Sequence, residues 1–117
     1  MFIKNLNGIS KEIVQSGNRA YKQVLIGSDQ GLNFAMRRFI IEPGGDMPLH
    51  TNTVEHEQFV LNGRAKVIIG DETYEVKKND IVFIPSGIKH SYTVLGDDAF
   101  EFLCVVPNKI DTMEVFK

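Results

Sequence analysis

The chain has 117 residues, a formal net charge of −2 and a pI near 5.9, which argues against a nucleic-acid partner. Its length favours one domain that is large enough to bury a core without disulfide or metal staples. A single cysteine, Cys104, excludes an internal disulfide framework and suits a reducing compartment, and no apolar run approaches the length of a membrane span. We therefore expect a soluble, cytoplasmic protein.

Short apolar runs separated by turn residues predict β-strands along most of the chain. The expected strands cover residues 12–15, 20–26, 33–41, 55–61, 65–69, 73–76, 81–84, 91–95 and 100–106. About nine short strands at a spacing of roughly eight to twelve residues, without a convincing helix, are typical of a β-sandwich or barrel. The predicted fold class is all-β, and residues 108–117 have no clear pattern.

Three of these elements carry further expectations. Pro43-Gly44-Gly45 is expected to end the strand 33–41, because proline and glycine punctuate regular structure. Asn62-Gly63 lies between two strand-like runs and predicts a tight hairpin, since both residues tolerate a positive φ. The run 81–84 is entirely apolar and predicts a buried strand.

The three histidines, His50, His56 and His90, are all that the chain contains, and each lies beside a turn signal at the end of a strand-like run. Imidazole is the commonest protein ligand for zinc, copper, iron and nickel. A β scaffold that brings these ends together would create a metal site. A single histidine in a β protein is more often an ordinary hydrogen-bonded residue, so both interpretations remain open at this point.

Neighbouring polar residues follow the two-residue period of a strand. Asn52 and Gln58 each lie two residues after a histidine and should share its face. Glu55 and Glu57 flank His56 and should therefore point to the opposite face, towards solvent or a partner.

Two other features have competing interpretations. Arg37 and Arg38 are adjacent within a predicted strand, so one of them must face inward or into an interface. A buried arginine needs a carboxylate partner, from the protein or from a ligand, and pairing within the protein is the favoured alternative. Cys104, in an apolar run, is most simply a small core residue.

Two longer motifs now connect these residues. The first, G-x5-H-x-H-x3-4-E-x6-G, is filled by Gly44, His50, Asn52, His56 and Gly63. The second, G-x5-P-x-G-x2-H-x3-N, is filled by Asn79, Pro85, Gly87, His90 and Val94. The sequence thereby resembles the cupins, β-barrel proteins of the jelly-roll type. The resemblance implies one cupin domain over residues 1–117, with motif 1 at about 44–63 and motif 2 at about 79–94.

The sequence looks more closely like the small single-domain (type 2) bacterial cupins with an H-x-H-x3-H first motif, in which four histidines bind a divalent metal, often manganese. The resemblance implies that His50, His56 and His90 are metal ligands here. Asn52 stands where the subgroup has its second histidine, so Asn52 and Gln58 are expected to be weak ligands or groups beside the ligands. Manganese, iron, nickel and zinc all remain candidates. Small members are commonly homodimers, which implies an interface role for residues 1–26.

Three functions are compatible with this resemblance, because a fold does not fix a function. The first is a metal-dependent enzyme, oxygenase-like or an isomerase, that acts on a small molecule in the barrel, with no catalytic side chain assigned. Asn52 and Gln58 would then orient the substrate or a metal-bound water. The second is a non-catalytic cupin that binds or senses a small molecule, with or without metal. The third is a metal-free barrel in which water joins the histidines.

Overall fold

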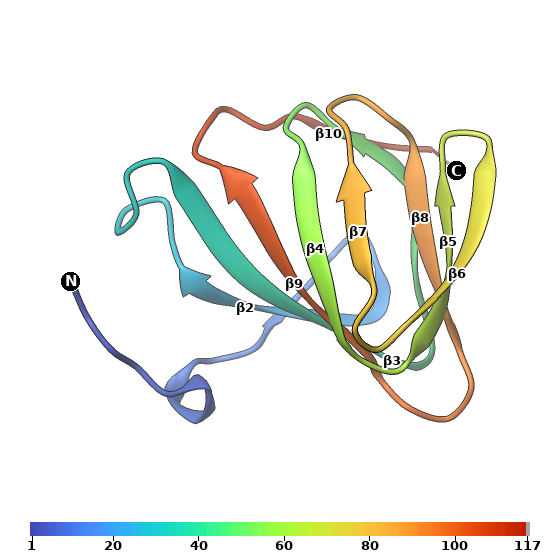
Figure 1. The fold of residues 1–117 in the computed structure, drawn as a ribbon, viewed down its shortest axis with the longest axis horizontal. Coiled ribbons are helices and arrows are strands. Elements are labelled where there is room, and N and C mark those ends of the chain that lie inside the picture. Colours follow the sequence, from blue (N-terminus) through green and yellow to red (C-terminus); the bar gives the residue numbers. More distant parts are fainter. Residues whose placement is uncertain (117) are drawn as a thin grey trace.

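The computed structural model describes residues 1–116, which form ten β-strands and one short 3₁₀ helix (Figure 1). The elements in chain order are η1 (Leu6–Gly8), β1 (Glu12–Ile13), β2 (Asn18–Ile26), β3 (Phe34–Asn52), β4 (His56–Asn62), β5 (Arg64–Ile69), β6 (Glu72–Lys77), β7 (Ile81–Ile84), β8 (His90–Leu95), β9 (Phe100–Pro107) and β10 (Met113–Val115). The all-β prediction is confirmed. No helix within residues 1–116 is long and apolar enough to cross a membrane.

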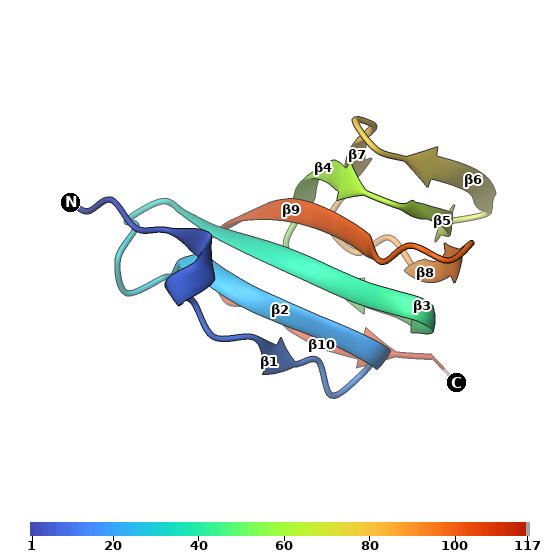
Figure 2. The ribbon, with the colours of Figure 1, turned by 90° about the horizontal axis from the view of Figure 1, so that it is seen from below.

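The strands form one antiparallel sheet that curls into a jelly-roll half-barrel. Neighbouring strands follow the order β6-β5-β8-β3-β9-β4-β7, with β2 and β10 on the other edge of β3 and β1 beyond β2. In Figure 2, β2, β3 and β9 run together, and β4, β5, β6 and β7 lie to one side of them. No ladder joins β6 to β7 in the described part of the chain, so the two ends of the sheet meet at an open seam.

The long strand β3 links the two halves of this structure. Before its bend it pairs with β2 and β9, for example Arg37 with Cys104, and after it with β8, for example Asp46 with Thr93. The prediction that Pro43-Gly44-Gly45 ends the strand is wrong. Gly44 adopts a φ of +82°, which only glycine takes without strain, so the strand bends here and continues.

The core lies between the inner faces of the curled sheet. Alternate residues of each strand point inward, as the two-residue period requires. Phe102 stacks on Phe39 and on Tyr92, with ring centroids 5.2 Å apart in each pair. Burying a side chain of this size contributes about 1.5–3 kcal/mol, so this aromatic cluster is a major source of stability.

The strand β7 departs from its prediction as a fully buried strand. Val82 and Ile84 are buried, but Ile81 is 80% exposed and Phe83 is 54% exposed. Exposed and buried residues alternate along β7, so Ile81 and Phe83 lie on the outer face of the sheet, as does the 40% exposed Phe59 of the neighbouring β4.

The Asn62-Gly63 hairpin is a third correction. β4 pairs with β7 and β9, whereas β5 pairs with β6 and β8, so the two strands on either side of Gly63 are not partners. Gly63 does have a positive φ, of +76°, but it forms a corner between the two halves of the barrel. The Asn62 side chain holds this corner by donating a hydrogen bond from Nδ2 to the carbonyl oxygen of Ala99 at 3.0 Å.

The two ends of the chain also take part in the structure. β10 lies in the tail whose state the sequence left open, and it pairs with β3, Met113 opposite Asn52 and Val115 opposite His50. At the other end, Gln23 of β2 donates a hydrogen bond to the carbonyl oxygen of Ile9 at 2.8 Å, which ties the N-terminal segment to the sheet. The homodimer interface over residues 1–26 stays a prediction.

Replacing Gly63 by alanine is expected to destabilise the protein by about 3 kcal/mol or more. The substitution forces a non-glycine residue into a positive φ, which costs about 1–2 kcal/mol, and its Cβ would lie 2.3 Å from the carbonyl oxygen of Ala99. Gly44→Ala is the matched control, because Gly44 has a similar φ and no heavy atom within 4 Å of the added Cβ. Urea denaturation measures both. Equal losses in the two variants would contradict the close contact at Ala99.

Candidate metal centre

The fold brings all three predicted histidines together inside the barrel. His50 near the end of β3 and His90 at the start of β8 are direct cross-strand partners, and their ring centroids are 4.1 Å apart. His56 opens β4, which does not pair with β3 or β8, yet its ring lies 5.7 Å from that of His90. All three side chains are buried, with at most 7% exposure.

Backbone carbonyl groups fix the orientation of two of the rings. His50 Nδ1 lies 2.7 Å from the carbonyl oxygen of Pro48, and His90 Nδ1 lies 2.9 Å from that of Ile88. A carbonyl oxygen only accepts hydrogen bonds, so each Nδ1 carries the proton and each Nε2 keeps a free lone pair. This is the tautomer in which imidazole ligates a metal through Nε2.

The inner nitrogens of the site lack hydrogen-bond partners. Nε2 of His56 and Nε2 of His90 are buried and unpaired within the described residues. Nδ1 of His56 lies 3.5 Å from the Cys104 sulfur, and a thiol can act as a weak donor or a weak acceptor. Buried polar atoms without partners are rare in folded proteins, so these two imidazole nitrogens are candidate donor atoms for a ligand.

The histidines border two spaces that share four of their lining residues. The inner one is a cavity of about 20 Å³, lined by Phe39, Met47, His50, His56, Gln58, His90, Tyr92 and Phe102. The outer one is an open hollow of about 410 Å³, which we call the barrel mouth; it is lined by Ile13, Val14, Gln15, Ser16, Lys22, Arg37, Phe39, Met47, His50, Asn52, His56 and Met113. His50 and His56 belong to both linings, so a molecule in the barrel mouth can reach them.

Asn52 is positioned by a residue that the sequence analysis missed. Its Nδ2 donates a hydrogen bond to Asp111 Oδ2 at 3.0 Å, and the other oxygen of Asp111 accepts from the Thr53 amide at 2.9 Å. The amide oxygen of Asn52 is left buried and without a partner among the described residues. The hydrogen bond to Asp111 therefore decides which end of the amide is free, and this end is an oxygen that can act as a donor atom towards a cation.

Gln58 lines the inner cavity and is absent from the lining of the barrel mouth. Its Nε2 donates to the hydroxyl oxygen of Tyr92 at 2.8 Å and approaches the Cys104 sulfur at 3.8 Å. Burial raises the pKa of the Tyr92 hydroxyl, so this wall of the cavity stays uncharged at neutral pH. Glu55 and Glu57 are exposed, as the alternation around His56 predicted.

The electrostatic environment keeps the imidazoles neutral. Burial, followed by the charge of Arg37 and then that of His90, lowers the pKa of His56 from its usual 6.5 to about 3. Burial and then His50 lower the pKa of His90 to about 4, and burial also lowers the pKa of His50. The neutral ring is the form that ligates a metal, so no proton has to be displaced near pH 7.

The donor atoms fit a divalent transition metal in their chemistry: three imidazole nitrogens and an adjacent amide oxygen. In the present structure, however, these donor atoms do not form a ready-made metal site. Within residues 1–116, no group of three or more His, Cys, Asp or Glu side chains is placed so that it can hold an ion as it stands. The ring of His90 lies between the other two, with centroids 4.1 Å from that of His50 and 5.7 Å from that of His56.

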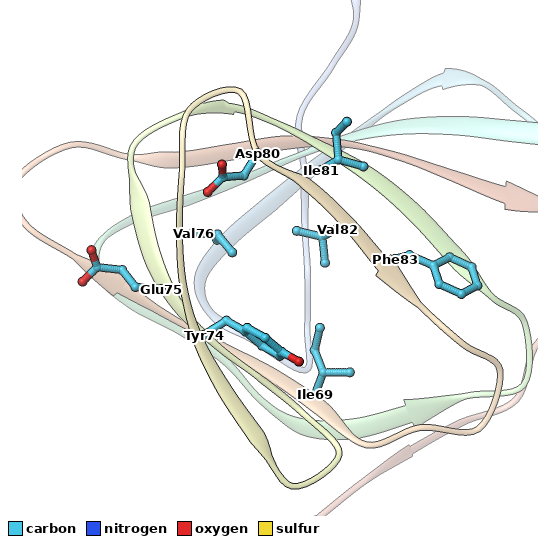
Figure 3. Close-up of a pocket in the computed structure, with 8 residues that line it drawn as sticks. All are labelled: Ile69, Tyr74, Glu75, Val76, Asp80, Ile81, Val82 and Phe83. Carbon is cyan, nitrogen blue, oxygen red and sulfur yellow. The ribbon is translucent and has the colours of Figure 1, made fainter.

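A second pocket lies at the seam between β6 and β7 and offers no comparable chemistry. Figure 3 shows Tyr74, Val76 and Val82 directed into it, while Glu75 points away. Its other acid, Asp80, accepts a hydrogen bond from the Lys77 amide at 2.8 Å and thereby forms the turn before β7. This groove brings together no cluster of histidines, and the histidine cluster remains the candidate site.

The comparison with known families agrees with this architecture. The family model described as a cupin domain matches residues 37–106. The chain belongs to the cupin family. The matched segment runs from β3 to β9 and contains all three histidines. A cupin-2 domain protein from Rhodospirillum rubrum superposes with a TM-score of 0.86 at 25% identity, over 99% of this chain and 80% of that one.

Individual relatives of this cupin differ in their chemistry. The 1-methylthio-D-xylulose 5-phosphate methylsulfurylase of Rhodospirillum rubrum is 34% identical over 85 residues, which are 73% of this chain and 54% of that protein. The chain therefore spans about half the length of that curated relative. The polyketide cyclase RemF of Streptomyces resistomycificus superposes with a TM-score of 0.91 at 26% identity, over 100% of this chain and 86% of that one.

A predicted oxalate decarboxylase from Thermotoga maritima superposes with a TM-score of 0.81 at 20% identity, over 91% of this chain and 98% of that one. At that identity the likeness shows the fold alone.

Acid is expected to destabilise the metal-free cupin through its histidines. The unfolded chain takes up protons near the usual pKa of 6.5, whereas folded His56 and His90 resist protonation down to about pH 3 and about pH 4. The stability that these neutral rings provide is therefore complete above pH 6.5 and is lost as the pH falls towards 4. We expect a loss on the order of 1–2 kcal/mol for each of the two histidines by about pH 5, measured by urea denaturation after chelator treatment.

The control for this prediction is the double variant His56→Gln, His90→Gln, which has nothing to titrate at these two positions. Its free energy of unfolding should change less between pH 7.5 and about pH 5 than that of the parent. An equal change in both proteins would show that other groups control the acid sensitivity.

Proposed function

We propose that this cupin binds a divalent transition metal through His50, His56 and His90 and uses it to act on a small oxygenated molecule in the barrel mouth. The unpaired, buried Nε2 atoms of His56 and His90 are the observation that carries the proposal. A ligand that satisfies both nitrogens removes the penalty of leaving them desolvated. The named activities of the relatives, a methylsulfurylase and a polyketide cyclase, support a small-molecule substrate.

Three histidine ligands suit a catalytic role better than a structural one. Structural metal sites are usually closed by four protein ligands, whereas catalytic sites keep a position open for water or substrate. When bound, the metal would polarise an oxygen atom of the substrate or bind dioxygen. The neutral amide oxygen of Asn52 is a weaker donor than the imidazole that the related motif has there, so it competes little with an incoming ligand.

The surrounding residues have separate roles in this proposal. The carbonyl groups of Pro48 and Ile88 hold the His50 and His90 rings, and Asp111 directs the Asn52 amide. Gln58 and Tyr92 form a hydrogen-bonded, uncharged wall behind the histidines. Phe39 and Met47 give the inner cavity an apolar side.

Elemental analysis of protein purified without an affinity tag is the direct test of metal binding. We expect about one equivalent of manganese, iron, nickel or zinc in the parent and at least a tenfold lower content in His56→Ala, which loses one ligand. Glu57→Ala is the matched control, because Glu57 is exposed beside His56 on the opposite face of β4. It should keep its metal.

Thermal unfolding with and without chelator tests the same proposal independently. Metal that binds only the folded state at a concentration of about 100 Kd raises the free energy of unfolding by about 2.7 kcal/mol. The metal-free barrel would be supported if the parent contains no metal and its melting temperature does not change when metal or chelator is added. Bound metal with oxygen uptake would identify oxygenase chemistry, and bound metal without turnover on any substrate would support a binding cupin.

Asn52→His is expected to tighten metal binding by about tenfold, or about 1.4 kcal/mol. The new imidazole can donate one ring N–H to Asp111, as Asn52 Nδ2 does at 3.0 Å, and present the other nitrogen to the metal. Asp111→Asn should remove much of this gain, because it deletes the carboxylate that orients position 52. Titration with a metal indicator dye measures both effects, and unchanged affinity in Asn52→His would show that position 52 does not face the metal.

A further inference from the structure

The adjacent arginines of β3 have opposite surroundings. Arg38 lies on the outer face, where it forms an ion pair with Glu101 and a hydrogen bond with Gln23. Arg37 points to the inner face and lines the barrel mouth together with His50 and His56. Pairing within the protein, the favoured interpretation of the sequence, therefore holds for Arg38 and fails for Arg37.

Arg37 has no carboxylate partner in the described part of the chain. The ion pairs there are Arg19–Glu42, Arg38–Glu101 and Arg64–Glu75. The Arg37 guanidinium instead donates from Nη2 to the Cys104 sulfur at 3.4 Å and lies 5.0 Å from the centroid of the Phe39 ring. Its Nε is buried and has no hydrogen-bond partner within residues 1–116.

These contacts leave much of a permanently charged group uncompensated. A thiol sulfur is a weak acceptor, and an aromatic face supplies only a modest attraction for a cation. A half-buried guanidinium normally pairs with an anion, because desolvation of the unpaired charge is costly. The barrel mouth therefore lacks a negative group at this position.

The other residues of the barrel mouth indicate what kind of molecule would carry that negative group. Lys22 of β2 adds a second cation to the same hollow, and Ile13, Val14, Phe39, Met47 and Met113 give it apolar walls. Walls of this kind bind the hydrocarbon part of a ligand, while a few charged groups orient it. A planar guanidinium matches the two oxygens of a carboxylate in its geometry.

We propose that Arg37 binds the carboxylate of a small organic acid with an apolar body, with Lys22 assisting at the entrance and the histidines beside the bound molecule. The inference deepens the proposed function by naming the substrate class, and it rests on that function only for the reaction of the bound molecule. Anion binding at Arg37 itself requires no metal. The carboxylate would accept hydrogen bonds from Nε and the adjacent Nη and neutralise the guanidinium.

Calorimetric titration with benzoate and with its neutral analogue benzamide tests the charge requirement at low ionic strength. We expect benzoate to bind the parent at least tenfold more tightly than benzamide. Arg37→Met, which keeps an unbranched apolar side chain against Phe39, should abolish this preference, and Lys22→Met should weaken benzoate binding severalfold. Arg64→Met, which removes an exposed arginine paired with Glu75 and absent from the lining of the barrel mouth, should leave it unchanged.

A second substitution at Arg37 and a second anion test the proposal further. Arg37→Lys keeps the charge without the planar fork, so it should bind benzoate with intermediate affinity even if Arg37→Met folds poorly. Equal affinity of the parent for benzoate and benzamide, or undiminished benzoate affinity in both Arg37 variants, would overturn the proposal. Inorganic phosphate that binds as tightly as benzoate and competes with it would overturn the assignment to carboxylates.

Performing the titrations before and after metal removal separates this inference from the proposed function. Benzoate binding that depends on Arg37 in chelator-treated protein supports the anion site, whether or not metal binds. Metal content that depends on His56, together with no preference for benzoate in either metal state, would retain the metal centre and exclude the carboxylate site. Metal loading of Arg37→Met should equal or exceed that of the parent, because the substitution removes a like charge near the histidines.

Discussion

The continuity of β3 through Gly44 is the constraint on which the site depends. This 19-residue strand pairs with β2 and β9 before the bend and with β8 and β10 after it. Arg37 lies in the first part, and His50 and Asn52 lie in the second. A strand that ended at Pro43 would separate these residues, whereas a bent strand places them around one hollow. Gly44 permits the bend because its φ of +82° carries no penalty for glycine.

Without a ligand, the barrel interior carries the positive charge of Arg37, which forms no ion pair within the described residues. Burial keeps the imidazoles neutral, so they do not neutralise Arg37, whose charge lowers the pKa of His56 further after the effect of burial. Asp111 is engaged by Asn52 and Thr53 at the edge of the site. A bound cation would satisfy the free imidazole nitrogens but would increase the positive charge near Arg37. An anionic ligand would offset both, so the two proposed binding events are expected to favour each other.

Local patterns predicted the strands well and their partners poorly. Alternation placed Glu55 and Glu57 outside and His56 inside, because successive side chains of a strand point to opposite faces. Asn62-Gly63 has the backbone preference of a hairpin turn, yet β4 and β5 pair with other strands, since a positive φ specifies a local bend and not the partner of the next strand. Ile81 and Phe83 are apolar and exposed because they lie on the outer face of the sheet, which an unbroken apolar run does not reveal.

The all-β class, the cupin motifs and the candidate ligands His50, His56 and His90 could be predicted without the structure, because strand periodicity and motif spacing are local properties. That Arg37 faces the site while Arg38 pairs with Glu101, and that Asp111 directs the Asn52 amide, follows from the folded sheet alone. The Arg38–Glu101 and Asn52–Asp111 contacts join residues 63 and 59 positions apart. Which side chains meet at such separations depends on how the whole sheet curls, and no local pattern contains that information.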